Sequence, residues 1–177
     1  MSCPTGNPLL DQQATRTLLD SLYKLAGGDS VPSKKLERGG YLYEDSTGTM
    51  KYVVLPPDPA DNACKTQSSL SQPYPGTIIA GVHIHPFKHY DVTDICHPPD
   101  PSKTNHYNGN SCVTFSCSDL DSRLIAEIIE YGAAYEGMIV MDKEKIAFAR
   151  PGTTSTNVKK SGWKQQWKRQ QSSCQIA

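Results

Sequence analysis

The spacing of hydrophobic positions predicts a helix near the N-terminus. Apolar residues recur there on one helix face, at Leu10, Ala14, Leu18, Leu22 and Ala26. We expect this helix to begin at Asn7-Pro8, because such residues favour helix starts, and to end at Gly27-Gly28.

The pattern then changes to the shorter period of β-strands. Residues Gly40 to Glu44 and Met50 to Leu55 predict a hairpin that turns around Ser46-Thr47-Gly48. The apolar run from Thr77 to His85 is typical of a buried central strand, and Pro86 ends it.

The second half of the chain is predicted to contain one strand, one helix and a second hairpin, and it does not repeat the first half. A short strand is predicted over Cys112 to Phe115, followed by a helix capped by Ser118. The expected core positions of that helix are Leu120, Leu124, Ile125, Ile128 and Ile129. A second hairpin is predicted from Gly137 to Met141 and Lys145 to Ala149, so strands interrupted by two helices predict an α+β fold or a three-layer α/β/α sandwich.

With 177 residues, the chain is long enough for one domain with its own core, which we place at residues 1–150. Pro56 to Pro75 is a polar loop, and residues 87–111 form a longer one of the kind that often lies at an active or binding site. The basic polar tail, residues 151–177, carries Trp163 and Trp167 at helical spacing. It is either a disordered terminus or a short amphipathic helix that docks on the domain or on a partner protein.

Charge and hydropathy exclude several classes of partner. The net charge is zero, which argues against general nucleic-acid binding because phosphates require a surplus of Lys and Arg. No stretch approaches the roughly 18 apolar residues of a membrane span. The N-terminal residues also lack the charged and apolar regions of a signal peptide.

The six cysteines show no Cys-x-x-Cys pair, so a zinc ribbon or a thioredoxin-like motif is not expected. Cys96 and Cys112 are the favoured pair for a disulfide, which would close the proline-rich loop between them. The alternative is that the cysteines are buried free thiols in a reducing compartment.

Candidate chemistry begins with His83 and His85. Alternate residues of a strand share a face, so both imidazoles are expected to project to the same side. Two neutral imidazoles form half of a typical zinc site, although most His-x-His pairs are ordinary edge histidines.

Carboxylates from two other segments could complete such a site. Ser116 and Asp119 occupy a predicted strand-to-helix turn, where an acid is favoured by the helix dipole. Glu37 stands two residues before the pair Gly39-Gly40, at the entrance to a strand. Taken singly, Asp119 can be a simple dipole partner and Glu37 a solvated loop residue.

Together these residues resemble the JAB/MPN (JAMM) metallopeptidase family, whose pattern is Glu, then His-x-His-Pro, then Ser-x-x-Asp. The matches are Glu37, His83-Ile84-His85-Pro86 and Ser116-Cys117-Ser118-Asp119. The chain looks closest to compact JAB-like domains at the C-termini of bacterial Rhs and type VI secretion effectors. The resemblance spans about residues 36–150 and implies a three-layer α/β/α sandwich with a mixed sheet.

One feature departs from the family pattern. The gap between Pro86 and Ser116 is much longer than the family's usual spacing, so residues 87–111 would be an inserted loop. At the usual spacing His97 could be the third metal ligand in place of Asp119. We prefer Asp119, because it alone combines a preceding predicted strand with a following helix.

The resemblance implies a zinc-dependent hydrolase of amide bonds. His83, His85 and Asp119 would bind Zn²⁺ and leave a position for water, whose pKa the metal lowers. Glu37 would serve as general base and then acid, and Ser116 would hydrogen-bond the developing oxyanion. The substrate would be a protein or peptide, and the chain a secreted antibacterial effector toxin with a neutralising immunity protein.

Three other interpretations remain open. The substrate could be a peptidoglycan peptide, with action in the periplasm of a target cell. The fold could be a metal-free JAB-like binding module. Zinc could instead be held structurally by the long loop, through Cys96, His97, His106 and Cys112.

Overall fold

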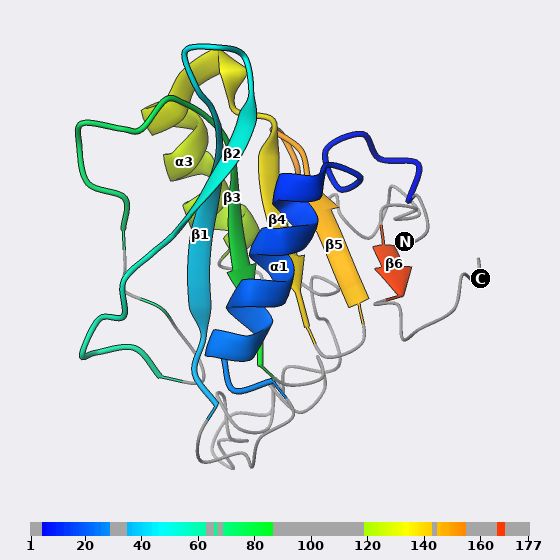
Figure 1. The fold of residues 1–177 in the computed structure, drawn as a ribbon, viewed down its shortest axis with the longest axis vertical. Coiled ribbons are helices and arrows are strands. Elements are labelled where there is room, and N and C mark those ends of the chain that lie inside the picture. The colour runs from blue at the N-terminus through cyan, green and yellow to red at the C-terminus, as the bar shows by residue number, and fades with distance from the viewer. Residues whose placement is uncertain are drawn as a thin grey trace.

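The computed structural model describes residues 5–28, 35–62, 66, 69–86, 119–142 and 145–154, and the backbone of residues 166–168. These residues form an α+β fold built on a six-stranded mixed sheet in the order β2-β1-β3-β4-β5-β6 (Figure 1). The strands are β1 (Arg38–Glu44), β2 (Met50–Val54), β3 (Thr77–Ile84), β4 (Gly137–Met141), β5 (Lys145–Ala149) and β6 (Gln166–Lys168). Strands β3 and β4 are parallel, and the other neighbours are antiparallel. The two predicted hairpins and the central position of β3 are confirmed.

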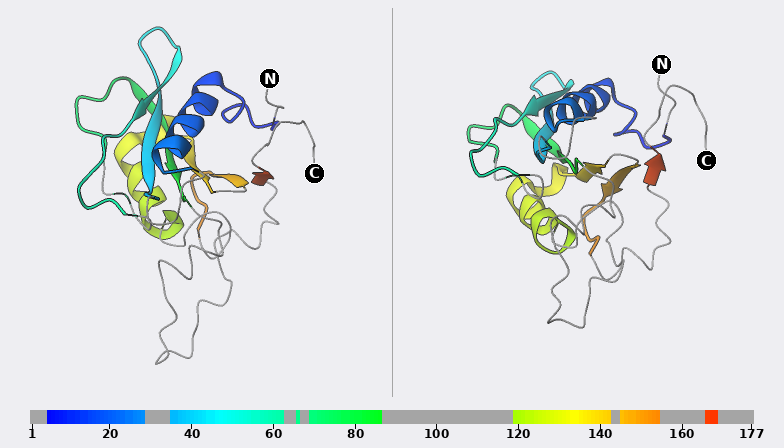
Figure 2. Two further views of the ribbon diagram at one scale, coloured as in Figure 1. Left: turned by 60° about the horizontal axis from the view of Figure 1, so that its bottom comes forward. Right: turned by 90° about the horizontal axis from the view of Figure 1, so that it is seen from below.

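A helix lies against each face of the sheet (Figure 2). The helices are α1 (Gln13–Leu25), the π-helix η2 (Asp119–Arg123), α3 (Leu124–Tyr131) and the 3-10 helix η3 (Gly132–Ala134). Helix α1 contacts β1, β2 and β3, whereas α3 contacts β3 and β4 from the other side. Among the helices that the structure describes, none combines the length and apolar character needed to cross a membrane.

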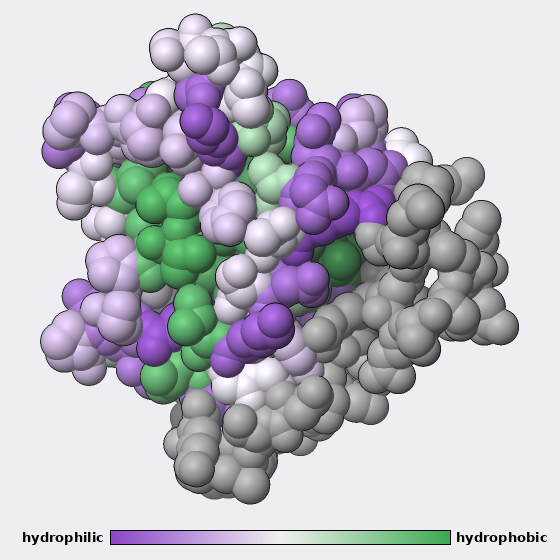
Figure 3. Space-filling view, in the orientation of Figure 1, coloured by the Kyte–Doolittle hydropathy of each residue, from purple (hydrophilic) through white to green (hydrophobic). Residues whose placement is uncertain are grey.

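The face of the sheet under α1 is an apolar core. Leu18 and Leu22 of α1 are fully buried there, against Leu42 of β1 and Val82 and Ile84 of β3. Glycine at residue 40 allows this packing, because a Cβ there would lie 2.6 Å from the Val53 carbonyl oxygen and 2.9 Å from Leu18 Cδ1. Figure 3 shows the molecule from the side of α1. Hydrophilic residues, in purple, lie on this surface beside a green apolar area.

The opposite face carries a second cluster under η2 and α3. Its apolar members include Leu120, Leu124, Met138 and Val140, all fully buried. This face also contains buried charged and polar residues, which the α1 face does not gather in comparable number. The two sides of the sheet therefore differ in chemistry as well as in the helix that covers them.

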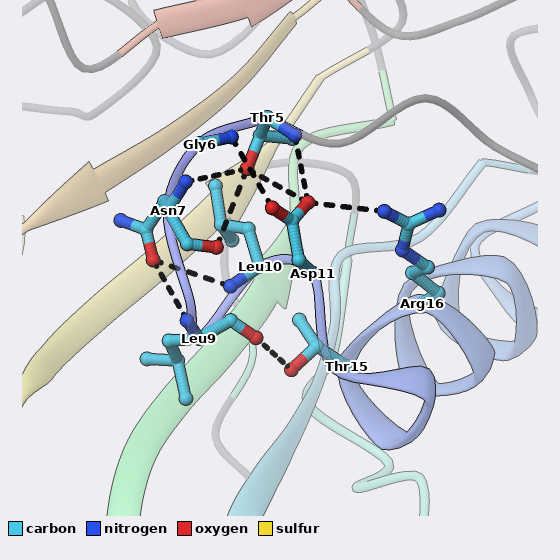
Figure 4. Close-up of polar contacts among 8 residues, drawn as sticks. All are labelled: Thr5, Gly6, Asn7, Leu9, Leu10, Asp11, Thr15 and Arg16. Atoms are coloured by element: carbon cyan, nitrogen blue, oxygen red, sulfur yellow. Dashed lines mark hydrogen bonds and ion pairs between the residues drawn. The ribbon is translucent and has the colours of Figure 1, made fainter.

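The N-terminal helix begins later than the pattern predicts, at Gln13 rather than at Asn7-Pro8. Figure 4 shows the reason: the Asn7 side chain accepts hydrogen bonds from the backbone N–H groups of Leu9 and Leu10 and caps a separate turn. The Asp11 carboxylate then accepts the N–H of Thr5 and pairs with Arg16 at 3.0 Å. The helix ends before Gly27-Gly28, as predicted.

Helix α3 buries a different face from the one predicted. Leu120, Leu124 and Ile128 do pack on the sheet, but Ile125 and Ile129 are 45% and 78% exposed. The buried position between them belongs to Glu127. The prediction of core positions at Ile125 and Ile129 is therefore wrong, because a partnered carboxylate replaces them on the inner face.

The C-terminal tail contributes one short element within the described residues. The backbone of β6 pairs antiparallel with β5, with Trp167 opposite Ile146. The proposed helix through Trp163 and Trp167 is therefore not formed at residues 166–168, which are extended. The predicted strand from Cys112 to Phe115, the inserted loop 87–111 and all six cysteines lie outside the described residues.

Candidate metal centre

Two histidines stand at the carboxyl end of the central strand. His83 lies in β3 and His85 follows its end, and their ring centroids are 5.0 Å apart. The neighbouring Val82 and Ile84 point to the α1 core, so both imidazoles project to the α3 side, as the alternation predicts. The N–H of His85 donates to the Met141 carbonyl at 2.8 Å, which ties this end of the site to β4.

Glu37 reaches the same place from the residue before β1. Because Gly39 lies opposite His83 in the β1–β3 register, residues at the start of β1 face the end of β3. The backbone N–H of Glu37 donates to the Asn62 carbonyl at 2.8 Å, so the loop after β2 holds this residue in place. The carboxylate Oε1 then lies 3.8 Å from Nε2 of His83.

Asp119 arrives from the opposite direction, at the first residue of η2. Its Oδ2 atom lies 3.3 Å from Nε2 of His83 and 3.5 Å from Nε2 of His85. All four residues are buried: their relative exposures are 5% for Glu37, 0% for His83, 7% for His85 and 8% for Asp119. The structure thus brings together the four residues that the sequence motif singles out.

The two carboxylates have different proton affinities. Burial raises the pKa of Glu37 to about 7. Burial also acts to raise the pKa of Asp119, but the two histidines hold it well below its ordinary value. Asp119 is therefore a permanent anion, whereas Glu37 can exchange a proton near neutral pH.

The two imidazoles differ as well. Burial lowers the pKa of His83 to about 4, so this ring is neutral over the physiological range. Burial acts in the same sense on His85, but the hydrogen bond with Asp119 and the charge of Glu37 outweigh it and raise its pKa to about 9. The protein without metal therefore holds a proton on His85 at neutral pH.

The donor atoms suit a divalent metal. Glu37, His83 and His85 each offer a ligand atom within 4.8 Å of the others. A tetrahedral zinc site with bonds of about 2.0–2.1 Å has ligand atoms roughly 3.4 Å apart. The distances from Asp119 Oδ2 to the two histidine nitrogens, 3.3 and 3.5 Å, match that spacing better than the 3.8 Å between Glu37 and His83.

The second nitrogen of His83 adds to this argument. Its Nδ1 atom is buried and has no hydrogen-bond partner among the described residues. Nε2 is the nitrogen that faces both carboxylates, so it is the one placed to bind a metal. The ring is held by packing and by the pairing of β3 rather than by a hydrogen bond at Nδ1 in this part of the chain.

Next to the metal-ligand cluster lies a polar network that the sequence motif does not reveal. Glu127 accepts hydrogen bonds from the hydroxyls of Tyr41, at 3.0 Å, and Tyr135. The Nε of Arg123 donates to the same carboxylate at 3.3 Å. The Tyr135 hydroxyl also accepts the N–H of Gly81 at 3.1 Å. The network therefore joins α3 to β1 and to β3, two residues before His83 in β3.

Glycine at residue 81 makes room for this network. A Cβ there would lie 2.7 Å from Oε2 of Glu127 and 2.9 Å from the Tyr135 hydroxyl. The signal for this role in the sequence is weak, since Gly81 is one small residue within an apolar strand. From local sequence, Glu127 is expected to be a solvent-exposed residue of an amphipathic helix. Its partner Tyr41 is 86 residues away in the chain, so the sequence around Glu127 does not reveal the pairing.

A buried lysine links the two segments that flank the site. Lys35 donates from Nζ to the Pro86 carbonyl at 2.9 Å, which links the segment before β1 to the segment after β3. Beside it, Arg38 pairs with Asp61 at 3.1 Å and fixes the loop whose Asn62 holds Glu37. Sequence reasoning missed both contacts.

The remaining sequence-predicted site residues lie outside the described residues. These are Ser116, the alternative ligand His97, and the set Cys96, His97, His106 and Cys112 that could hold a structural zinc. The role of Ser116 as oxyanion donor and the choice of Asp119 over His97 therefore stay predictions. Asp119 does lie beside the two histidines.

Comparison with known proteins does not identify a family. No family model matches the chain, and neither a curated protein nor a solved structure matches it. The resemblance to JAB/MPN domains therefore rests on the motif residues of the sequence.

Proposed function

We propose that this chain is a zinc-dependent amide-bond hydrolase, a peptidase or isopeptidase with a JAB/MPN-like site. The observation that carries the proposal is the buried convergence of His83, His85, Asp119 and Glu37 from three separate segments of the chain. Charged and polar side chains are rarely buried together unless they are paired or bind a metal. The quartet matches the Glu, His-x-His-Pro and Ser-x-x-Asp pattern in residue type and in order.

His83, His85 and Asp119 would hold the metal. Asp119 Oδ2 lies 3.3 and 3.5 Å from the Nε2 atoms of His83 and His85, so these three side chains could bind one ion together. When bound, zinc supplies Lewis-acid activation of a water molecule and of the substrate carbonyl. Asp119 suits a ligand role because it stays anionic over the working pH range.

Glu37 would move the proton. It lies beside His83 but at the longest of the three ion-pair distances, which suits a group that approaches water rather than the metal. A carboxyl whose pKa is near 7 can accept a proton from water and deliver it to the leaving nitrogen. In this scheme Glu127, a further buried acid, orients its own partners and takes no part in proton transfer.

The fold supports the family likeness only in its coarse features. A mixed sheet with a helix on each face, and a metal-ligand pair at the end of its central strand, is compatible with a JAB/MPN-like three-layer sandwich. Pro86 and Asp119 flank residues 87–118 in the sequence; Pro86 adjoins the site residue His85, and Asp119 belongs to the site.

The biological role follows from the resemblance to effector domains. We propose a protein or peptide substrate and delivery of the chain as an antibacterial toxin into a target cell, with an immunity protein as its natural inhibitor. A peptidoglycan peptide is the alternative substrate. We propose no nucleic-acid partner, because the net charge of the chain is zero.

The test is the substitution Glu37→Gln, which keeps the shape of the side chain and removes its ability to accept a proton. We expect the variant to retain zinc and to lose at least about 100-fold in hydrolysis of a mixed peptide library, because general bases contribute about 10²–10⁴-fold. Toxicity on expression in a bacterial periplasm should fall in parallel.

Glu44→Gln is the matched control. Glu44 is exposed and ends strand β1 opposite Thr77, at the other end of β3 from His83. Full activity of Glu37→Gln with zinc bound would rule out Glu37 as the base. A wild-type protein that binds no zinc would instead support a metal-free binding module.

A further inference from the structure

Arg123 is a cation placed beside the metal centre that the proposed mechanism does not use. It ends η2, one helical turn after Asp119, and its side chain is 25% exposed. Its Nε donates to Glu127, and Glu127 is fixed in turn by the hydroxyls of Tyr41 and Tyr135. The guanidinium is therefore held at one nitrogen by a buried carboxylate.

The rest of the guanidinium is available in the part of the chain that the structure describes. Glu127 is its hydrogen-bonding partner there, and the contact uses Nε, so the two Nη amino groups take no part in it. Arg123 follows Asp119 by four residues in the same helical segment, and its partner Glu127 is bonded to the Tyr135 hydroxyl, which holds Gly81 two residues before His83. The positive charge of Arg123 also acts to lower the pKa of Glu37 and of His83.

Pairing with the buried carboxylate of Glu127 accounts for a cation at residue 123. This contact uses one donor, however, and Glu127 also receives two tyrosine hydroxyls, so the structural role leaves the other donors of the guanidinium unexplained. Arginine differs in offering a planar fork of donors that matches a carboxylate with two parallel hydrogen bonds. Anchoring at Nε reduces the side-chain entropy that binding of an anion would otherwise cost.

We propose that Arg123 binds a carboxylate of the substrate, so that the site selects amides that carry a free carboxylate close to the scissile bond. Arg123 is then a specificity-determining residue, and Glu127 is the residue that positions it. This inference rests on the proposed function, since it takes the scissile amide to lie at the cluster of His83, His85 and Asp119.

The experiment uses ligands that bind zinc without being cleaved. Monohydroxamates of succinic, glutaric and adipic acid carry a free carboxylate at three chain lengths, and their carboxamide counterparts are neutral and of the same shape. Dissociation constants for each pair are measured by calorimetry on zinc-loaded wild-type, Arg123→Gln, Arg123→Lys and Arg150→Gln proteins. Zinc content and circular dichroism are recorded for every protein.

We expect wild type to prefer the carboxylate form by about tenfold at the best chain length, since a charge-assisted bidentate pair contributes on that scale. Arg123→Gln should lose the preference while it keeps zinc and its affinity for the neutral ligands. Arg123→Lys keeps the charge without the fork and should retain a reduced preference. Arg150→Gln should match wild type, because Arg150 is exposed and follows the end of β5 that pairs with Met138, away from His83.

The two proposals fail in different ways. An equal preference in wild type and in both Arg123 variants, with zinc present, would overturn the role of Arg123 and leave the metal site intact. A wild type that shows no preference at any chain length would do the same. Absence of zinc from the wild-type protein would overturn the proposed function, and the role of Arg123 with it. If Arg123→Gln does not fold, the comparison rests on Arg123→Lys, where a preference equal to that of wild type counts against the proposal.

Discussion

The two faces of the sheet in this protein carry out different tasks with alternate residues of the same strand. On the α1 side, Val82 and Ile84 join a core of leucines. On the α3 side, Gly81, His83 and His85 meet hydroxyls and carboxylates. One side of β3 therefore contributes hydrophobic stabilisation, and the other brings buried polar and charged groups together.

This separation explains how a domain of this size can bury so many ionisable groups. Each buried carboxylate or imidazole costs free energy unless it is paired, and the pairs on the α3 side only partly offset that cost. Burial of apolar surface under α1 is favourable without such costs. We infer that the α1 face supplies the stability on which the polar face depends.

The largest effect should come from weakening the apolar face. Leu22→Ala removes a fully buried side chain from the middle of the α1 core, which should lower the free energy of unfolding by about 2–5 kcal/mol. Chemical denaturation measures this change, and zinc bound per folded molecule should stay as in wild type.

Leu25→Ala is its control, because Leu25 belongs to the same helix and is half-exposed. That variant should stay within about 0.5 kcal/mol of wild type. Loss of zinc from folded Leu22→Ala protein would contradict the separation of the two faces.

A smaller effect should come from the polar network on the α3 face. Tyr135→Phe removes the hydroxyl that accepts the Gly81 N–H and donates to Glu127, and it leaves both groups buried. We expect a loss of about 1–3 kcal/mol in the free energy of unfolding. Tyr52→Phe, at an exposed tyrosine of β2, should be nearly neutral. Equal stability of Tyr135→Phe and wild type would mean that the network contributes no net stability.

The pH dependence of zinc affinity should show which groups release protons. Between about pH 7 and 9 the metal displaces one proton from His85, whose pKa is raised to about 9, so affinity should rise about tenfold per pH unit. Below about pH 7 Glu37 is protonated too, and the slope should steepen as that proton is also lost on binding. His83 adds no slope in this range because its pKa is lowered to about 4.

Competition with a chromophoric chelator across a buffer series measures this slope. Glu37→Gln should keep the slope between pH 7 and 9 and lose the extra steepness below it. An affinity that does not change between pH 7 and 9 would show that His85 is not protonated in the metal-free protein.

The sequence was sufficient for features that depend on local periodicity. The β1–β2 and β4–β5 hairpins and the central strand follow from alternation and turn residues, and the structure confirms them. The same alternation places His83 and His85 on one face. The prediction that Glu37 and Asp119 lie close to that pair rests on the family motif. Periodicity could not supply it, because no local rule links segments so far apart.

The inner face of α3 could not be predicted from its own residues. Hydropathy favours Ile125 and Ile129 as core positions and Glu127 as solvent-exposed, yet the reverse is observed. Glu127 is buried because Tyr41, Tyr135 and Arg123 satisfy its carboxylate, and Tyr41 belongs to a strand at the other end of the domain sequence. Tertiary pairing thus overrides local hydropathy wherever polar groups find partners.

The start of α1 was mispredicted for a related reason. Asn7 is a good capping residue, and its side chain does cap backbone N–H groups. It caps an isolated turn, however, because Asp11 and Thr15 make side-chain contacts that separate this turn from the helix. A capping residue in the sequence therefore predicts a turn at that position, but it does not predict whether a helix continues from the turn.

The central claim is that the buried quartet binds zinc, and elemental analysis of purified protein tests it most directly. We expect one zinc ion per wild-type chain, and loss of that zinc in both His83→Ala and Asp119→Asn with the fold retained by circular dichroism. Asp121→Asn is the matched control in the same π-helix, and it should keep its zinc because Asp121 is exposed. Zinc-free wild type, or full zinc retention in both ligand variants, would contradict the assignment.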